Sequence, residues 1–321
     1  MKFLIVADPI ETLTPATDTG LSLLREALKR GHEVAWATIH DCMIWETHPA
    51  VQAQLIHSCE KSELPKDRSE PIRCLLTDFD GIWIRKDPPF DENYVSLCWL
   101  LALVEKKVPI INPASVLLRY HEKLLPLEAI QNGYIESDEI IPTYIVTPTN
   151  TPAIENLPER SWVSKPWLGH AGGGIQRWES TGELKTALND PSQFPAENRI
   201  ILQPFLQEIA TEGDRRIYFL DGRHAADFVR IPKKGDFISN IAYGGTGIIK
   251  PRNARETILI KKLEKFLQAV RIQIAGVDMI NGRVSEINIT APTGFQKLIQ
   301  LGGPDLNPVY LNMAEKQKNG N

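Results

Sequence analysis

The segment AGVDMINGRVSEINIT, residues 275–290, decides the fold expected for this chain. Its apolar residues alternate with polar ones on both sides of Asn281-Gly282, a dipeptide typical of tight hairpin turns. The segment therefore predicts two antiparallel strands. Glu286 and Asn288 are two residues apart, so they share one face of the second strand.

The length of the turn decides whether Asp278, on the first strand, shares that face. A two-residue loop sets Asp278 opposite Ser285 and turns Glu286 to the other side of the hairpin. A three-residue loop, which takes in Arg283, sets Asp278 opposite Glu286 and brings both carboxylates to the face of Asn288. The segment alone leaves both registers open.

Two carboxylates on one apolar hairpin face require a cation. At about 5 Å and an effective dielectric of 20 they repel each other by about 3 kcal/mol. Asp278, Glu286 and Asn288 offer only oxygen ligands, which is the donor type that Mg²⁺ prefers. The alternative interpretation is an ordinary hairpin face exposed to solvent.

Composition excludes several classes of protein. The chain has 321 residues and a net charge of −4, so it carries no electrostatic footprint of a nucleic-acid or membrane binder. No apolar run approaches the length of a membrane span, and residues 1–7 lead directly into Asp8-Pro9, as in a first buried strand. The four cysteines form no CxxC pair, which indicates free thiols in a reducing cytoplasm. The scattered histidines make a zinc site improbable.

The first third of the chain predicts an α/β domain with a parallel sheet, because strand and helix signals alternate. Residues 41–70 are weakly patterned and are expected to be peripheral. The expected strands are 3–7, 33–38, 73–76, 81–85 and 108–112, and the expected helices are 21–29, 94–106 and 113–124.

The rest of the chain predicts two α+β modules. A small one has strands at 142–146, 161–165 and 199–202 and a helix at 181–189. The last third opens with a hairpin at 216–220 and 223–230, and ends with helices at 254–270 and 306–315. Between the hairpin and the first of these helices lies the irregular segment 232–247, which has the length of a functional lid.

Two lysines and one strand end are candidates for nucleotide binding. Lys165 ends an apolar strand and precedes the glycine-rich segment 169–175, an arrangement that suits phosphate but also fits a plain turn. Lys123, expected within a helix that ends before Pro126, is on its own most simply a surface lysine. Residues 203–206 close a strand whose backbone could contact an adenine edge.

Three arginines lie at strand ends or on the hairpin. Arg85, Arg216 and Arg230 each have an aspartate nearby in the sequence, and guanidinium groups bind carboxylates and phosphates in two-point fashion. Taken singly, each is more simply the partner of a surface ion pair.

The motifs taken together resemble the ATP-grasp superfamily and, within it, the bacterial glutathione synthetases. The resemblance rests chiefly on RKDPPF at 85–90, on Lys165-Pro166 with its glycine loop, and on EINITAPTG at 286–294. It implies three domains: a substrate-side α/β domain at 1–123, a central lid domain at 124–202 and a C-terminal domain at 203–321.

The resemblance also implies roles for single residues. The nucleotide would be held by Lys123, Lys165, Gly172, Gly173, Gln203, Phe205, Leu206 and Asp214. Two Mg²⁺ ions, or Mn²⁺ in their place, would be held by Asp278, Glu286 and Asn288. The acyl substrate and its phosphoryl group would face Arg85, Arg216, Arg230 and Asn240.

The implied reaction is peptide-bond formation through an acylphosphate. ATP phosphorylates the C-terminal carboxylate of γ-glutamylcysteine, the amine of glycine attacks, and phosphate leaves. Such a reaction depends on cations and positioning rather than on a protein nucleophile. The implied partners are these small molecules and further copies of the chain in a homo-oligomer.

The chain departs from the family pattern where the acceptor is recognised. Ile238 stands where an arginine is usual, Leu168 where an aspartate is usual, and 170–171 read His-Ala where Met-Gly is usual. After the PTG of 292–294, residues 295–297 read Phe-Gln-Lys, whereas the family commonly has Ile-Arg. A related ATP-grasp peptide ligase with another acid or amine, and a nucleotide-binding regulator without turnover, therefore stay open as alternatives.

Overall fold

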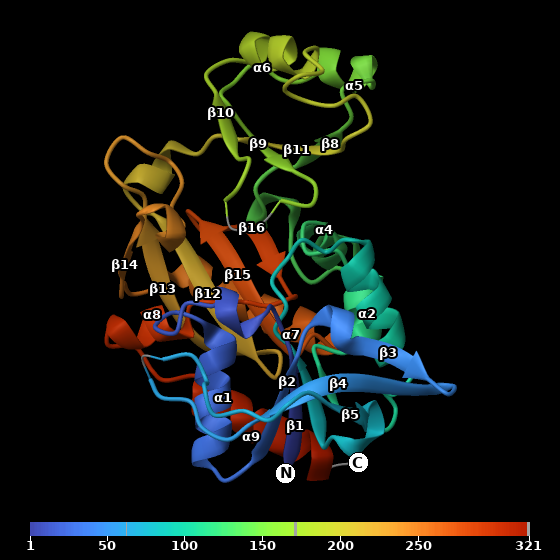
Figure 1. The fold of residues 1–321 in the computed structure, drawn as a ribbon. Coiled ribbons are helices and arrows are strands. Elements are labelled where there is room, and N and C mark those ends of the chain that lie inside the picture. Colours follow the sequence, from blue (N-terminus) through green and yellow to red (C-terminus); the bar gives the residue numbers. More distant parts are fainter. Residues whose placement is uncertain (62, 170–171, 320–321) are drawn as a thin grey trace.

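In the computed structural model, which describes residues 1–61, 63–169 and 172–319, three β-sheets follow one another along the chain. Figure 1 shows the N-terminal sheet and the C-terminal sheet in one body, with the central sheet standing above them. An α/β chain with this division agrees with the fold class expected from the sequence.

The N-terminal sheet is mixed rather than parallel. Its strands are β1 (Lys2–Val6), β2 (Glu33–Ala37), β3 (Cys42–Trp45), β4 (His48–Ile56), β5 (Ile72–Leu75), β6 (Gly81–Ile84) and β7 (Ile110–Ile111). β1 pairs in parallel with β2 and β6, and β6 with β7, but β4 pairs antiparallel with β2, β3 and β5.

The expectation that residues 41–70 are peripheral is therefore wrong, because β3 and β4 extend the sheet. Three of the side chains that β4 buries are small, since Ala50, Val51 and Ala53 are at most 1% exposed. Alanine contributes little to an apolar alternation pattern, which is why the sequence signal of this strand was weak.

Helices cover both faces of this sheet (Figure 1). Phe3 and Ile5 of β1 share a core with α1 (Thr19–Lys29), whereas Leu4 and Val6 share the other core with α2 (Glu92–Ala102). Asp18 is the N-cap of α1, since its carboxylate accepts the Leu21 N–H at 2.6 Å.

Lys123 lies in a turn, not in a helix. α3 (Ala114–Arg119) ends before an extended Tyr120, and α4 (Leu125–Gln131) starts a new helix two residues after Lys123. The predicted single helix that ends before Pro126 is therefore wrong. Pro126 lies in the first turn of α4, where its missing N–H costs nothing, so this proline begins a new helix instead of ending one.

The central sheet lies largely within residues 124–202, the segment expected to be a lid domain, and is called the lid sheet. It is antiparallel in the order β10-β9-β11-β8, with strands β8 (Tyr144–Val146), β9 (Trp162–Pro166), β10 (Gln176–Trp178) and β11 (Ile200–Pro204). Helices α5 (Thr151–Glu155) and α6 (Thr181–Leu188) lie beyond it, on the side away from the body (Figure 1). Trp162, Trp178 and Leu184 belong to a separate small core.

The C-terminal sheet is antiparallel in the order β14-β13-β12-β15-β16. Its strands are β12 (Asp214–Leu220), β13 (Arg223–Ile231), β14 (Thr246–Ile248), β15 (Ile274–Ile280) and β16 (Arg283–Asn288), and its helices are α7 (Ala254–Ala269), α8 (Phe295–Gln300) and α9 (Asn307–Asn319). Short 3₁₀ helices lie at Ile10–Thr12, Ile39–Asp41, Leu76–Asp78, Ser137–Glu139, Gln207–Ala210 and Ile241–Tyr243. In the parts of the chain that are described, no helix is both long and apolar enough to cross a membrane.

The hairpin of β15 and β16 combines features of both predicted registers. The turn has two residues, Asn281 (φ 50°) and Gly282 (φ 66°), and Ile280 pairs with Arg283. A bulge then inserts Ser285 as an extra residue, so that Asp278 pairs with Glu286. The three-residue loop is therefore wrong, but the register for which it was invoked is the one observed.

Asn112 fastens this hairpin to the N-terminal sheet. Its buried amide donates to Ile274 O at 2.7 Å and to Ile289 O at 2.6 Å, and its carbonyl oxygen accepts the N–H groups of Gln273 and Ile274. One side chain at the end of β7 thus holds both the start of β15 and the residue that follows β16.

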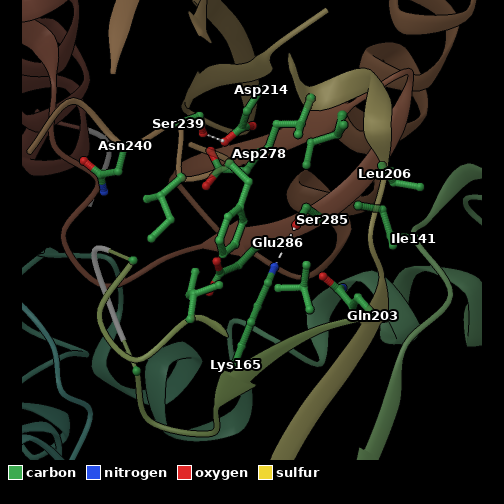
Figure 2. Close-up of a pocket in the computed structure, with 18 of the residues that line it drawn as sticks. Ile141, Lys165, Gln203, Leu206, Asp214, Ser239, Asn240, Asp278, Ser285 and Glu286 are labelled. Atoms are coloured by element: carbon green, nitrogen blue, oxygen red, sulfur yellow. Dashed lines mark hydrogen bonds between the residues drawn. The ribbon is translucent and has the colours of Figure 1, made fainter. Parts of the chain in front are cut away.

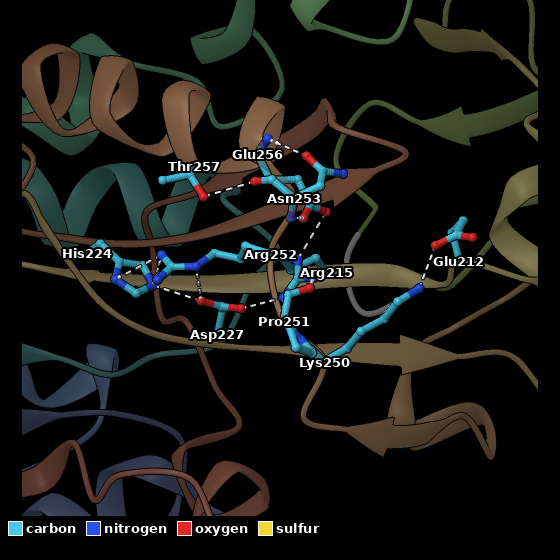
Figure 3. A network of polar contacts seen from close by, with 10 residues as sticks. All are labelled: Glu212, Arg215, His224, Asp227, Lys250, Pro251, Arg252, Asn253, Glu256 and Thr257. Atoms are coloured by element: carbon cyan, nitrogen blue, oxygen red, sulfur yellow. Dashed lines mark hydrogen bonds and ion pairs between the residues drawn. The ribbon is translucent and has the colours of Figure 1, made fainter.

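A second polar cluster, centred on Arg215, holds the segment that follows the irregular loop. Figure 3 shows Arg215 of β12 at its centre, donating to Asp227, to Glu256 and to the carbonyl oxygens of Lys250 and Pro251. Arg215 is 3% exposed. The end of the loop is therefore attached to the face of the sheet opposite to that of Arg216.

Candidate active site

One cavity between the lid sheet and the C-terminal sheet collects the candidate residues (Figure 2). Every residue singled out from the sequence lines it except Arg85: Lys123, Lys165, Gly172, Gly173, Gln203, Phe205, Leu206, Asp214, Arg216, Arg230, Asn240, Asp278, Glu286 and Asn288. Residues separated by more than 160 positions thus converge, although no single motif required it.

Asp278 is held by two arginines. Arg216 donates from Nε to Oδ1 at 2.6 Å and from Nη2 to Oδ2 at 3.1 Å, and Arg230 Nη2 lies 2.8 Å from Oδ1. Burial favours the neutral acid, but the two guanidinium groups outweigh it and hold the pKa of Asp278 below its usual value. Protein cations therefore supply the charge that this hairpin face requires.

Asp214 links Arg230 to the irregular segment 232–247. Its carboxylate pairs with Arg230 and accepts a hydrogen bond from the Ser239 hydroxyl at 2.8 Å (Figure 2). Burial raises the pKa of Asp214 despite the nearby Arg230. Since Ser239 belongs to the irregular segment, this contact attaches the middle of that segment to β12.

The two lysines occupy the opposite wall. Lys123 Nζ lies 2.8 Å from Glu122 Oε1, 3.2 Å from Glu286 Oε1 and 2.9 Å from the carbonyl oxygen of Gly169. Burial opposes its charge, but Glu286 and Glu122 raise the pKa of Lys123. Lys165 Nζ donates to Ser285 at 3.1 Å (Figure 2), and burial lowers the pKa of this lysine.

The far end of the cavity is apolar. Ile141, Val163 and Ile280 line it beside the strand end of Gln203, whose amide donates to Thr143 at 3.0 Å. Apolar walls beside a strand end suit a purine ring. These apolar residues and Ser285 were missed from the sequence, because each looks there like ordinary strand interior.

Arg85 lies outside this cavity. Its guanidinium is buried and donates from Nη2 to the carbonyl oxygen of Pro292 at 3.0 Å, while its Nε has no partner within residues 1–61, 63–169 and 172–319. The aspartates nearest in sequence to Arg216 and Arg230 are not the partners of these arginines. Arg216 pairs with Asp278, and the acidic partner of Arg230 on its own hairpin is Asp214.

The glycine loop and the irregular segment meet at Gly172. This residue has φ +95°, and a Cβ there would lie 3.3 Å from Cγ2 of Ile238 and 3.4 Å from the ring of Tyr243. Glycine is therefore needed both for backbone conformation and for close approach. His170 and Ala171, which depart from the family pattern, lie outside the described residues.

The residues at the hairpin fit Mg²⁺ bound together with phosphate. Among the described residues there is no group of three or more His, Cys, Asp and Glu side chains that could hold a metal by itself. Asp278 and Glu286 supply two carboxylates in register, and Asn288 adds an amide oxygen while its Nδ2 donates to Gly276 O at 3.1 Å. Mg²⁺ commonly takes one or two carboxylates and completes its shell with substrate phosphates and water.

Comparison with known proteins agrees with this geometry. A family model described as the ATP-grasp domain of prokaryotic glutathione synthetase matches residues 134–303, and a model of the N-terminal domain of the same proteins matches residues 1–118. The chain belongs to the prokaryotic glutathione synthetase family. ATP-grasp ligases of this kind use ATP and Mg²⁺.

Relatives in the family match over nearly the full length of the chain. The glutathione synthetase of Nitrosomonas europaea is 28% identical over 98% of both chains, and that of Prochlorococcus marinus strain MIT 9313 is 32% identical over 95% of this chain and 96% of its own. The crystal structure of the D-cycloserine synthetase DcsG, at 14% identity, superposes with a TM-score of 0.67 over 99% of both chains. That likeness confirms the ATP-grasp fold.

Proposed function

We propose that this chain, an ATP-dependent ligase by family, joins γ-glutamylcysteine to glycine and releases glutathione, ADP and phosphate. One observation carries the proposal. In a chain of the prokaryotic glutathione synthetase family, two lysines, a glycine loop, three acidic or amide oxygen donors and two arginines line a single cavity. These are the groups that phosphoryl transfer to a carboxylate needs.

The nucleotide lies between the two sheets in this account. The adenine contacts the apolar end at Gln203, Phe205 and Leu206, and the phosphates extend toward Lys123 and Lys165. The short distances from Lys123 to Gly169 and Glu286 support this direction, since they join the glycine loop to the metal-binding strand. Gly172 and Gly173 cover the phosphates with backbone N–H groups.

Asp278, Glu286 and Asn288 hold two Mg²⁺ ions in this account. Ions bound there would supply positive charge beside the phosphates and the transferred phosphoryl group. Arg216 and Arg230, which point into the same cavity, orient the substrate carboxylate and its phosphoryl oxygens. Asp214 positions Arg230, and Asn240 lies on the loop that closes over the reacting atoms.

Arg85 takes a different part from the other two arginines. Its contact with Pro292 O attaches the RKDPPF motif to the segment after β16. In this role Arg85 positions that segment and does not line the nucleotide cavity. Its Nε is buried and has no hydrogen-bond partner among the described residues.

A second ligase function is favoured by one observation. Ile238 lines the cavity at the position where the family usually has an arginine. A related ATP-grasp ligase with another acid or amine would account for this loss of charge. A regulator without turnover is less well supported, because the complete oxygen donor set has no use in simple nucleotide binding.

The remaining features are proposed on the same basis. We keep the domain boundaries 1–123, 124–202 and 203–321, and we place the protein in the cytoplasm, where its four free cysteines stay reduced. A homo-oligomer follows from the family resemblance.

The test is ADP release from ATP with γ-glutamylcysteine and glycine, compared with a panel of other acids and amines. We expect turnover with this pair, and glutathione as the product. Turnover with a different pair alone would favour the second ligase function. Tight ATP binding with no turnover on any pair would favour the regulator.

A further inference from the structure

Helix α2 and the turn after it carry an exposed stripe of residues. The buried side chains of α2 lie in the core that it shares with the N-terminal sheet: Tyr94, Leu97, Cys98 and Leu101. On the opposite side a second set is exposed: Glu92, Ser96, Trp99, Leu103 and Lys106. At 3.6 residues per turn, these five lie within about 40° of one line. We call them the α2 stripe.

The middle of the α2 stripe is apolar, although it faces solvent. Trp99 is 62% exposed and Leu103 is 65% exposed, and their spacing of four residues makes them neighbours on the helix surface. A single apolar residue at a surface is ordinary, whereas an adjacent pair that includes an aromatic side chain is typical of a protein contact. An amphipathic helix with one buried face would carry polar residues there.

The sheet beside α2 continues this apolar surface. α2 packs against β3, and Figure 1 shows it on the outside of the body beside the β3–β4 hairpin. Ile44 of β3 is exposed, and it shares a strand face with Cys42, which belongs to the same core as α2. Ile44 therefore lies on the side of the sheet that α2 covers, at the same outer edge of the domain.

The two ends of the α2 stripe carry opposite charges. Glu92 begins α2, and Lys106 follows it in a turn whose backbone hydrogen bonds, from Val104 to Leu101 and from Lys107 to Val104, continue the helical path. At 1.5 Å per residue, Glu92 and Lys106 are about 20 Å apart. Both are exposed, and among the described residues neither takes part in an ion pair. The stripe thus changes from negative through apolar to positive along its length.

A surface with this order of charges is complementary to itself when two copies lie antiparallel. Trp99 is midway between Glu92 and Lys106 in the sequence. A twofold axis at Trp99 therefore brings the two indole rings together and sets Glu92 of each copy opposite Lys106 of the other. A parallel pair would set like charges opposite each other instead. Self-complementary contacts around a twofold axis are the commonest kind in homo-oligomers.

We propose that the α2 stripe binds the α2 stripe of a second copy of this chain, antiparallel and around a twofold axis at Trp99. The inference rests on the proposed homo-oligomer and names the surface that forms it. None of the described residues of the stripe lines the cavity of the candidate active site, so the contact leaves that cavity accessible in both copies.

Trp99→Ser tests the centre of the contact. Sedimentation velocity of the wild-type chain over a series of concentrations should show a dimer or a larger even-numbered assembly, with at least twice the 36.1 kDa of one chain. Because buried tryptophans dominate protein contacts, the substitution should raise the dissociation constant of the α2 contact at least about tenfold. Circular dichroism should show an unchanged fold. Ile258→Ser, at an isoleucine of α7 that is 58% exposed, is the matched control and should leave the assembly as it is.

Glu92→Lys tests the ends of the contact and its direction. It sets lysines opposite each other in the antiparallel pair, and at low ionic strength it should raise the dissociation constant at least about fivefold. Adding Lys106→Glu to the same chain restores opposite charges and should return the constant to within about twofold of the wild-type value. A parallel pair would keep like charges opposite each other in the double variant, so a failure to restore binding would overturn the antiparallel arrangement.

The outcomes separate this inference from the proposals on which it rests. A wild-type assembly that is unchanged in Trp99→Ser would overturn the α2 contact alone and leave the homo-oligomer to another surface. A wild-type chain that stays monomeric up to its highest soluble concentration would overturn both. Glutathione formation is measured separately, and its absence would overturn the proposed reaction without changing the result for the α2 stripe.

Discussion

Asp278 lies directly opposite Glu286, although the turn between their strands has only two residues. The bulge at Ser285 shifts the register by one position, and a shift of one residue exchanges the two faces of a strand. The same extra residue places the Ser285 hydroxyl 3.1 Å from Lys165 Nζ. One inserted residue thus sets both the carboxylate pair and a contact to the lid.

Glu286→Gln should abolish ADP formation and leave the fold intact. The amide keeps the size of the side chain but removes one of the two carboxylates available to Mg²⁺, so we expect a loss of at least about a hundredfold in kcat. Phosphate release reports the rate, and circular dichroism reports the fold. Glu212→Gln, at an exposed ion pair with Lys250, should keep full activity. Near-normal activity of Glu286→Gln would remove Glu286 from the metal site.

Asn112→Ala should destabilise the protein strongly. The substitution removes four hydrogen bonds and leaves buried backbone groups of Gln273, Ile274 and Ile289 unpaired. At about 1–3 kcal/mol for each unsatisfied buried group, the free energy of unfolding should fall by at least about 3 kcal/mol. Urea unfolding measures this. Asn132→Ala, at an exposed asparagine, should cost less than about 1 kcal/mol, and similar values for both variants would contradict the fastening role of Asn112.

Arg215→Met tests the cluster in Figure 3. It leaves Asp227 and Glu256 without their buried partner and frees the carbonyl oxygens of Lys250 and Pro251. Removing one partner of a buried ion pair costs about 3–5 kcal/mol. Chemical unfolding of this variant should show that loss, whereas Arg68→Met, at an exposed pair with Glu11, should lose at most about 1 kcal/mol. A loss of less than about 1 kcal/mol in Arg215→Met would show that the cluster contributes little.

The stability of the protein should fall in mild acid partly because of His121. Burial lowers its pKa from 6.5 to about 4, so between these values the unfolded chain binds a proton that the folded chain does not. This contribution is complete above pH 6.5 and is lost as the pH falls toward 4. His121→Phe keeps the stack on Trp167 and removes the titration. Urea unfolding at about pH 7 and about pH 5 should show a smaller loss in the variant than in the wild type, and equal losses would contradict the assignment.

Much of the site could be predicted from the sequence, because its residues lie in motifs that a chain rarely contains together. Lys123, Lys165 and the donors on β16 were identified by position, and all of them line the cavity. The hairpins that turn at Asp221-Gly222 and Asn281-Gly282 were equally readable, because local chemistry determines them.

Two of the failures have long-range causes. The bulge at Ser285 adds a residue within a strand, which no local signal announces. Arg216 of β12 and Arg230 of β13 both pair with Asp278 of β15, whereas the sequence drew attention to aspartates close by in the chain. β4 was missed because its buried positions include Ala50 and Ala53, which add little to an apolar alternation pattern, although it pairs with β2, β3 and β5. Tertiary pairing decided the first two cases.

The central claim is tested most directly by the product formed from ATP, γ-glutamylcysteine and glycine. Incubation of wild-type protein with Mg²⁺ and these three substrates, followed by mass spectrometry, should show glutathione and ADP in equal amounts, and neither product should form with Glu286→Gln. ADP formation without glutathione, or glutathione formation that is unchanged in Glu286→Gln, would contradict the account.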